Sequence, residues 1–455
     1  MPTRDLGVLP NDVHRDPRAE ASLIFVTLAD GLDETIVKDW LTRLSALIDA
    51  SEDHQGRDAA YASTVIAFGS RFFNRFPQYA ANNPHGLTAP PTLPGEAEAL
   101  SADVALHVTY TSEARLADLL KGLWATRPTV TSIDIEHGYA RNDDREAFGH
   151  LDGLRNLTRD ERRKTTTIDH DRLPEEPDWL AGGCYLAYLK IEQNLDAFHG
   201  LDQPTQEQIM GRRTDDGSRL DLAPGTDPKT EAEFGDPSNP PQTSHLRKTG
   251  PRGTLHDQTG IFRRGVPYVE EEGGVLKFGL QFVSYQATLD DFDVVLNRWM
   301  LNHNFPQTNT GRDALVERQL LIFKRAGLFV VVPDDNRHPG AGYFDTPKPP
   351  KTLKKGRVHV RKIAVDAFGN PTNAEVGGIQ FTLHDQNGTQ IGDPVTTNPA
   401  GHAVLPEVPV GTTVIIRETT PDRFQAVGDL TITIDQPNRI ERITNTLKPD
   451  ANPYG

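Results

Sequence analysis

The sequence predicts an α+β fold made of two halves of similar order, followed by a small all-β sandwich. Strand-like and helix-like runs alternate in both halves, a proline-rich segment follows, and no helical periodicity remains after it. A chain of 455 residues is long enough for two or three domains with their own cores. We place the N-terminal half at residues 1–170, the C-terminal half at 171–346, the linker at 347–356 and the sandwich at 357–455.

The N-terminal half begins with an apolar run at residues 21–31 that ends in a glycine and predicts a strand. The next stretch, 32–50, spaces its apolar residues helically, for example at Trp40, Leu44 and Ile48, and predicts a helix. The same reasoning predicts the remaining elements of this half, which are strand 63–68, a proline-rich loop near 84–95, strand 104–110, helix 112–125 and strand 131–137.

The C-terminal half repeats this rhythm, which suggests a duplicated α+β unit. Its predicted elements are strand 181–193, helix 203–210, strand 275–285, helix 290–302 and strand 327–332. Between the second and third of these lies a polar loop, 212–243, rich in Asp, Pro and Gly. It is too long for a simple connection, so we expect it to wrap a site or the other half.

The last part of the chain has a different pattern of apolar and turn-forming residues. Prolines near residue 347 donate no ladder hydrogen bonds and favour a stiff, extended backbone, so residues 347–356 predict a semi-rigid linker. From residue 357 to 447 short alternating runs are separated by turn signals, with no helical period. This pattern is typical of a small β-sandwich of roughly immunoglobulin size.

Composition excludes several classes of function. Asp and Glu outnumber Lys and Arg by 64 to 48, and a net charge of −16 disfavours nucleic acids and anionic membranes as partners. The single cysteine, Cys184, rules out an internal disulfide and a zinc site of several thiolates. The N-terminus has no signal-peptide core, and the first apolar run, 23–29, is too short to span a membrane. We therefore expect a cytoplasmic location, with export by another route left open.

Three short motifs contain residue types that carry chemistry. Asp152 lies in the glycine-framed segment 149–153, His245 is the second residue of the segment Ser-His-Leu-Arg-Lys, and Arg263 lies just before an apolar strand. Each is weak alone. A lone histidine is more often a structural residue than a ligand, and a Gly-x-x-Asp-Gly segment is usually a turn. The order of the three motifs along the chain is more informative.

That order resembles the dye-decolourising peroxidases, a haem b family with two ferredoxin-like halves of the dimeric α+β barrel type. The resemblance covers residues 20–345. It is carried by five blocks in the family's order: Phe148–Gly153, Gln206–Arg212, Ser244–Arg252, Phe262–Tyr268 and Gly279–Phe292.

The resemblance implies roles for three residues. His245 would be the proximal ligand of the haem iron, which a neutral imidazole can bind. Asp152 and Arg263 would form the distal pair; Arg263 is chosen over Arg264 because it stands four residues before Pro267. Asp152 would move a proton between the peroxide oxygens, and the permanently charged Arg263 would stabilise charge that develops as the O–O bond breaks.

The sequence also departs from the family pattern. His150, Leu151 and Leu157 replace residues common at their positions, and Thr288 stands where an aspartate is frequent. The group that orients His245 is therefore left open between Asp290, Asp291 and a backbone carbonyl. Four aromatic residues lie near the motifs and are either core packing, the favoured interpretation, or a route for electrons: Tyr185, Tyr188, Tyr285 and Trp299.

The C-terminal sandwich resembles the Cna-B (SpaA-type, prealbumin-like) modules of bacterial surface proteins. The matching pieces lie at residues 358–371, 377–388, 417–424 and 443–447. In such modules a lysine and an asparagine can form an isopeptide bond assisted by an acid, and Lys362, Asn445 and Glu418 fall at similar positions. Burial would favour a neutral amine and a protonated acid.

As a whole, the sequence predicts a haem peroxidase with haem b as cofactor. Its partners would be hydrogen peroxide and small reducing substrates such as dyes and phenols, and the sandwich would be an adhesion, docking or stabilising module. Two alternatives stay open: a haem-binding or iron-handling protein without peroxidase turnover, and a structural surface protein. A homo-oligomer also stays open.

Overall fold

The computed structural model describes residues 20–51, 62–87, 93–95, 97–139, 143–154, 157–170, 173, 176–235, 238–252, 260–306, 309–345, 355–367, 369, 372, 374, 376–398, 401–434 and 438–448. The chain divides into two compact units. The first holds residues 1–250, 259–295 and 313–345, and the second holds 251–258, 296–312 and 346–455. Both predicted halves belong mainly to the first unit, so the boundary near residue 170 stays a prediction. Most of the predicted linker lies outside the described residues.

The first half contains the strands and helices that the periodicity predicts, together with several short ones. The elements are β1 Glu20–Leu28, α1 Glu34–Ser51, β2 Ala62–Gly69, α2 Ser70–Asn74, η1 Pro77–Asn82, β3 Glu98–Ala99, β4 Val104–Tyr110, α3 Glu113–Trp124, β5 Val130–Tyr139 and α4 Arg159–Thr166. The expected helix 112–125 is α3, which is one residue shorter at each end.

The second half is richer in short helices. Its elements are η2 Asp178–Leu180, β6 Cys184–Gln193, α5 Leu195–His199, α6 Gln203–Met210, α7 His245–Thr249, β7 Phe262–Arg263, β8 Val266–Glu272, β9 Val275–Gln286, α9 Leu289–Asp293, the π-helical η3 Val294–Met300, α10 Ala314–Glu317, β10 Leu321–Val331 and η4 Ala341–Phe344. The helix expected at 203–210 is α6. Strand β8 was not predicted, because its last three residues, all glutamates, break the apolar alternation.

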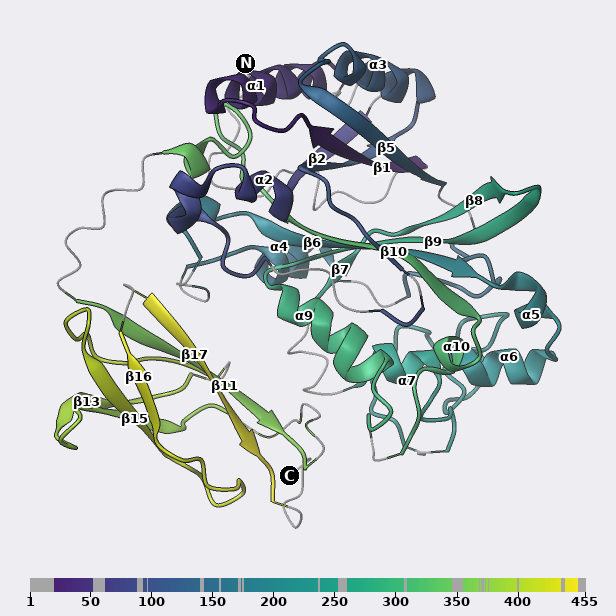
Figure 1. Ribbon diagram of the computed structural model, residues 1–455. Coiled ribbons are helices and arrows are strands. Elements are labelled where there is room, and N and C mark those ends of the chain that lie inside the picture. The colour runs from purple at the N-terminus through teal and green to yellow at the C-terminus, as the bar shows by residue number, and fades with distance from the viewer. Residues whose placement is uncertain are drawn as a thin grey trace. The chain divides into compact units, whose positions relative to one another are not determined.

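The described strands of the first unit form one ten-stranded sheet, ordered β5-β1-β4-β2-β10-β6-β9-β7, with β3 beside β10 and β8 beside β9 (Figure 1). Counting the four long strands of the first half along the chain, their spatial order is fourth, first, third, second. The second half repeats this order as β10-β6-β9-β8. The predicted duplication of a ferredoxin-like unit is therefore confirmed. The halves join where β2 pairs antiparallel with β10, with Gly69 opposite Phe329.

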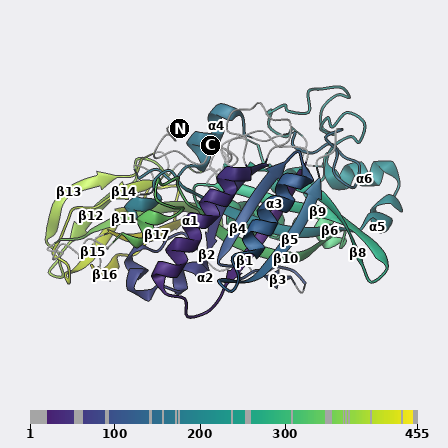
Figure 2. The ribbon, with the colours of Figure 1, turned by 90° about the horizontal axis from the view of Figure 1, so that it is seen from above.

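Helices cover the sheet on its outer faces. In Figure 2, α1 and α3 lie over the strands of the first half. Their buried residues, such as Trp40 and Leu44 on α1 and Leu119 on α3, are those that helical spacing selects. Strand β6 is buried along its whole length, including the polar residues Lys190, Glu192 and Gln193 near its end. None of the described helices has the length and apolarity to cross a bilayer.

The second unit contains the predicted β-sandwich. Its strands are β11 Arg357–Val365, β12 Gln380–His384, β13 Gln390–Thr396, β14 His402–Val404, β15 Thr413–Thr419, β16 Leu430–Thr433 and β17 Asn438–Thr446. They form one sheet ordered β14-β11-β17 and another ordered β13-β12-β15-β16. A core that includes Val360, Phe381 and Val414 forms from residues of both sheets. The first and last strands, β11 and β17, run parallel to each other.

Candidate active site

His245 is the first residue of α7, and its ring is held by a carboxylate. The Nδ1 atom lies 2.7 Å from Oδ2 of Asp313, which is fully buried. An ionised carboxylate only accepts hydrogen bonds, so we assign the proton of the neutral ring to Nδ1. This leaves the Nε2 lone pair available, and within the described part of the chain Nε2 makes no hydrogen bond.

Asp313 has two structural tasks. It stands directly before α10, and its Oδ1 accepts a hydrogen bond from the backbone N–H of Leu315 at 2.9 Å, which caps the helix. The next residue, Ala314, donates its backbone N–H to the carbonyl of Thr243 at 2.8 Å, close in sequence to His245. In this way α10 is tied to the segment that leads into α7, and the carboxylate is placed beside the imidazole.

The sequence-based candidates for this contact were wrong. The orienting group is neither a backbone carbonyl nor Asp290 or Asp291, which lie in the first turn of α9. Thr288 caps that helix by accepting from the backbone N–H of Asp291 at 3.4 Å. In sequence, Asp313 looks only like a helix N-cap, so nothing in the local pattern distinguishes its second role.

The electrostatics of His245 bring the other two predicted residues into the same region. Burial lowers the pKa of His245, but the adjacent Asp313 carboxylate outweighs it, and the net pKa is raised. Two further charges act on the same imidazole: Arg263 lowers its pKa and Asp152 raises it. His245, Arg263 and Asp152 therefore lie close enough in space for their charges to interact, although Asp152 and His245 are far apart in sequence.

Arg263 lies on a strand, whereas Asp152 lies on a loop. Arg263 is on the short strand β7, where it pairs with Ser284 of β9. Asp152 is an exposed residue of the loop 143–154, and its backbone N–H donates to the carbonyl of Asp144 at 2.8 Å. The two flanking glycines, Gly149 and Gly153, have φ angles of 92° and 67°. This left-handed conformation is why the loop carries glycine at both positions.

The buried carboxylate of Glu146 accepts hydrogen bonds from the backbone of this loop. Glu146 accepts hydrogen bonds from the backbone N–H groups of Phe148 (2.8 Å) and His150 (2.9 Å) and from the side-chain amide of Gln193 on β6 (2.5 Å). Burial raises the pKa of Glu146 to about 7, and the charge of Asp152 acts in the same direction. Sequence reasoning missed Glu146, because an acid two residues before a phenylalanine has no distinctive pattern.

The residues around His245 fit a haem group. The His245 side chain is 31% exposed although Ser244, Leu246 and Lys248 around it are buried, so the ring faces space that the described protein atoms do not fill. The Ser244 hydroxyl is buried with no hydrogen-bond partner among the described residues. An imidazole oriented by a carboxylate, with Nε2 free, is the ligand that haem iron takes in peroxidases.

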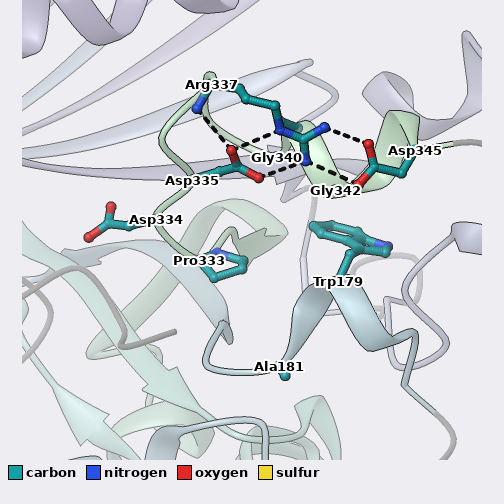
Figure 3. A pocket seen from close by; sticks show the side chains of 10 residues that line it. Trp179, Ala181, Pro333, Asp334, Asp335, Arg337, Gly340, Gly342 and Asp345 are labelled. Carbon is teal, nitrogen blue, oxygen red and sulfur yellow. Dashed lines mark hydrogen bonds and ion pairs between the residues drawn. The ribbon is translucent and has the colours of Figure 1, made fainter. Parts of the chain in front are cut away.

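A separate pocket lies away from these residues. It has a volume of about 270 Å³, and its lining includes Trp179, Pro333 and Asp335 (Figure 3). Arg337 bridges two carboxylates there, with Nη2 2.9 Å from Asp335 Oδ2 and 3.1 Å from Asp345 Oδ2. His245, Asp152 and Arg263 do not line it. We assign the Arg337 pairs a structural role, since they tie η4 to the loop after β10.

The four aromatic residues singled out in the sequence are all buried. Tyr185, Tyr188 and Tyr285 each place their hydroxyl in a hydrogen bond, to Glu176, Gln281 and His107 respectively. Trp299 belongs to the second unit, where its ring stacks on Phe305 with centroids 5.5 Å apart. Their burial agrees with the core-packing interpretation.

The sandwich also brings three predicted residues together. Lys362 on β11 donates from Nζ to Oδ1 of Asn445 on β17 at 2.5 Å, and it also bonds to Glu418 on β15. The Asn445 amide donates to Glu418 Oε1 at 2.5 Å. The side chains of Lys362 and Glu418 are 0% and 2% exposed. Burial lowers the pKa of Lys362, and the Glu418 charge opposes that shift only in part.

Comparison with known proteins agrees with this architecture. Residues 143–335 match the family "Dyp-type peroxidase, C-terminal", and residues 361–447 match "Prealbumin-like fold domain". The dye-decolorizing peroxidase of Mycobacterium tuberculosis is 26% identical over 301 residues, which are 65% of this chain and 81% of that protein. That of Thermobifida fusca is 31% identical over 149 residues, but these span only 31% of this chain and 34% of the relative.

Solved structures show the same fold. The crystal structure of a DyP-type peroxidase from Streptomyces coelicolor superposes with a TM-score of 0.62 at 21% identity, covering 75% of this chain and 96% of that one. The part of this chain that the superposition leaves over is consistent with the appended sandwich. The chain is thus similar to the dye-decolourising peroxidases over residues 143–335 and to prealbumin-like domains over residues 361–447, and its first unit has the fold of DyP-type peroxidase structures.

Proposed function

We propose that the chain is a haem b peroxidase that reduces hydrogen peroxide and oxidises dyes, phenols or other small electron donors. The observation that carries this proposal is the 2.7 Å hydrogen bond from His245 to Asp313. The charges of Arg263 and Asp152 also act on the pKa of the same imidazole. Haem held by His245 would supply the redox chemistry that splits a peroxide bond.

The side chains around the haem have separate tasks in this proposal. His245 would hold the haem iron through Nε2, and the Asp313 carboxylate would fix the ring orientation and make the ring a stronger donor. The Asp152 carboxylate takes a proton from one oxygen of hydrogen peroxide and returns it to the leaving oxygen. The positively charged Arg263 guanidinium stabilises negative charge as the O–O bond breaks.

The test is peroxide-dependent bleaching of a dye by the haem-loaded protein, recorded together with the Soret band. We expect Asp152→Ala and Arg263→Leu to keep the Soret band and to lose at least about 100-fold in turnover, the scale of a positioned proton-transfer group. Asp196→Ala and Arg318→Leu change exposed residues outside the site and are matched controls. Wild-type turnover in the absence of peroxide, or unchanged turnover in both site variants, would contradict the proposal.

The same experiment distinguishes the iron-handling alternative. A protein that releases iron from haem would convert the Soret spectrum to that of free porphyrin without bleaching the dye. The peroxidase leaves the haem spectrum recoverable after the dye is consumed. The cytoplasmic location and the homo-oligomer stay predictions.

We also propose that the sandwich forms an isopeptide bond between Lys362 and Asn445. The neutral Nζ amine attacks Cγ of Asn445, the Cγ–Nδ2 bond breaks, and ammonia leaves with a proton that passes through Glu418. The support is the buried triangle of contacts, in which Nζ lies 2.5 Å from Oδ1 of the amide it would attack. Glu418 contacts both the Lys362 Nζ and the Asn445 amide, so it lies where it can pass a proton from one nitrogen to the other.

Intact-mass measurement tests the bond directly. We expect the wild-type protein to lack the mass of one ammonia relative to its sequence. Glu418→Gln keeps the size and removes the acid, and Lys362→Met removes the nucleophile, so both should show the full sequence mass. A wild-type protein at its full sequence mass would refute the bond and leave the peroxidase proposal untouched.

A further inference from the structure

Residues 212–235, which we call the bridging loop, are held together by their own arginines. Arg212 donates to two backbone carbonyls of the loop, at 2.7 and 2.9 Å. Arg219 is 1% exposed and makes two parallel hydrogen bonds to the Asp221 carboxylate, at 2.9 and 2.5 Å. It also donates to the carbonyl of Ala232, near the end of the loop. A loop with a buried and fully engaged guanidinium at its centre can hold the segments at its two ends in fixed positions.

The beginning of the bridging loop contacts the loop that carries Asp152. Arg145 donates from Nη1 to the carbonyl of Gly149 at 2.5 Å, within its own loop. The same guanidinium donates to two carbonyls of the bridging loop, those of Thr214 at 2.8 Å and Asp215 at 3.1 Å. One side chain therefore joins the two loops, three residues before Asp152 on one side.

Apolar packing strengthens this contact. A Cβ atom at Gly217 of the bridging loop would lie 3.0 Å from Cδ1 of Leu151 and 2.9 Å from Cδ1 of Leu154. Carbon atoms do not normally approach so closely, so the two leucines pack directly on the glycine, whose φ of 70° also favours that residue. Leu151 directly precedes Asp152, and its side chain therefore rests on the bridging loop.

The end of the bridging loop contacts the helix that begins with His245. The Phe234 ring contacts two guanidinium groups, with Cζ of Arg219 4.3 Å and Cζ of Arg247 4.2 Å from its centroid. Arg247 is a buried residue of α7, two positions after His245. The bridging loop therefore contacts both segments that carry the candidate site, the Asp152 loop through Arg145 and α7 through Phe234.

We propose that Arg145 is a positioning residue for the reaction with peroxide and that it acts through the bridging loop, which couples the Asp152 loop to α7; the inference rests on the proposed peroxidase function. Asp152 can move a proton only from within hydrogen-bond reach of a peroxide oxygen. His245 determines where that oxygen would lie, because it would hold the iron. The two residues stand on separate segments, and the bridging loop connects these segments directly, so that their separation stays fixed.

The first test is hydrogen–deuterium exchange of the haem-loaded protein, which requires no turnover. We expect Phe234→Leu to speed exchange of the backbone amides of residues 143–154 by about twofold or more, although the substitution lies at the opposite end of the bridging loop. Arg145→Met should do the same. The double variant should exchange no faster than the faster single variant, because both changes break one connection. Arg337→Met is the matched control, since it removes a guanidinium that joins two other segments, and exchange at 143–154 should not change.

The second test is the rate of reaction with hydrogen peroxide, followed by stopped flow at the Soret band. Arg145→Met should lower the second-order rate constant by about 10- to 100-fold, because a shift of about 1 Å at a reacting group can cost about 100-fold. The Soret maximum and the KM for the dye should stay at their wild-type values. Arg145→Lys keeps the charge but lacks the forked donors, so it should not restore the rate. Arg337→Met should react at the wild-type rate.

Three results would overturn the inference. One is equal exchange of residues 143–154 in the wild type and in Phe234→Leu, which would show that the bridging loop does not couple the two segments. Another is a wild-type rate in Arg145→Met. The third is full restoration of the rate by Arg145→Lys, which would assign the effect to charge instead of the bridge. A wild-type protein with no Soret band or no reaction with peroxide would refute the proposed function, whereas a reactive wild type with an unaffected Arg145→Met refutes the positioning role alone.

Discussion

At the scale of single residues, the contact between His245 and Asp313 determines what the histidine can do. An imidazole with no acid beside it would be a weaker ligand and free to rotate. The buried carboxylate at 2.7 Å assigns the proton to Nδ1 and leaves Nε2 for a metal. His245 itself was predicted from the resemblance, whereas its partner Asp313 lies 68 residues later in the chain and was not predicted.

Replacing Asp313 by asparagine separates the effect of its negative charge on His245 from its role as the N-cap of α10. Asparagine caps helices as well as aspartate does, so α10 should persist in Asp313→Asn. With a neutral partner the imidazole becomes a poorer donor, and we expect haem affinity or turnover to fall by about 10- to 100-fold. The ferric–ferrous potential should rise, measured by spectroelectrochemical titration.

Asp291→Asn is the matched control for this substitution, because Asp291 was a candidate from the sequence and lies in the first turn of α9. Its potential should equal that of the wild type. The assignment of Asp313 fails if Asp291→Asn shifts the potential and Asp313→Asn does not.

At the scale of elements, the loop 143–154 depends on a carboxylate that the peroxide would never touch. Glu146 accepts hydrogen bonds from two backbone N–H groups of the loop that carries Asp152 and from the side-chain amide of Gln193 on β6. Its pKa is raised from 4.5 to about 7. Between these values the folded state keeps a proton on Glu146 that the unfolded state has lost, so this contribution to stability is complete below pH 4.5 and is lost as the pH rises through 7.

Glu146→Gln should remove this pH dependence, because glutamine does not titrate. We expect the free energy of unfolding of the wild type, relative to the variant, to fall by about 3 kcal/mol from pH 4.5 to 7. Denaturant unfolding of both proteins at several pH values measures the difference. Parallel curves for the two proteins across that range would contradict the assignment of Glu146.

At the scale of the whole molecule, the first unit and the sandwich are encoded in one chain, and each has its own buried core. The sandwich core includes residues on both of its sheets, and its first and last strands lie side by side. An isopeptide bond between Lys362 and Asn445 would close a loop of 83 residues and join those two strands covalently. Such a cross-link stabilises chiefly by restricting the unfolded chain.

Glu418→Gln should therefore unfold its sandwich at a lower temperature than the wild type. The expected loss is about 2–4 kcal/mol, by analogy with a disulfide that closes a long loop. Scanning calorimetry measures it, and the Soret band of the same haem-loaded sample reports on the first unit, which should be unaffected. Equal sandwich transitions in a wild-type protein that has lost ammonia would contradict the stabilising role.

The sequence by itself determined the α+β fold class and most of the long strands and helices, but not strand β8. Helix 203–210 and strand 104–110 were predicted at their observed bounds, because periodicity is a property of neighbouring residues. The resemblance pointed to His245, Asp152, Arg263 and the Lys362, Glu418 and Asn445 set, which the structure brings together in two places.

Only the tertiary structure revealed the partners of those residues. Asp313 reaches His245 because a backbone hydrogen bond ties α10 to the segment before α7, and His107 meets Tyr285 across 178 residues because the two halves share a core. Glu146 accepts hydrogen bonds from two backbone N–H groups of a loop in which Gly149 and Gly153 adopt positive φ angles. Such contacts depend on how strands and helices far apart in the sequence pack together. Local periodicity does not indicate which distant side chain will lie against a given residue.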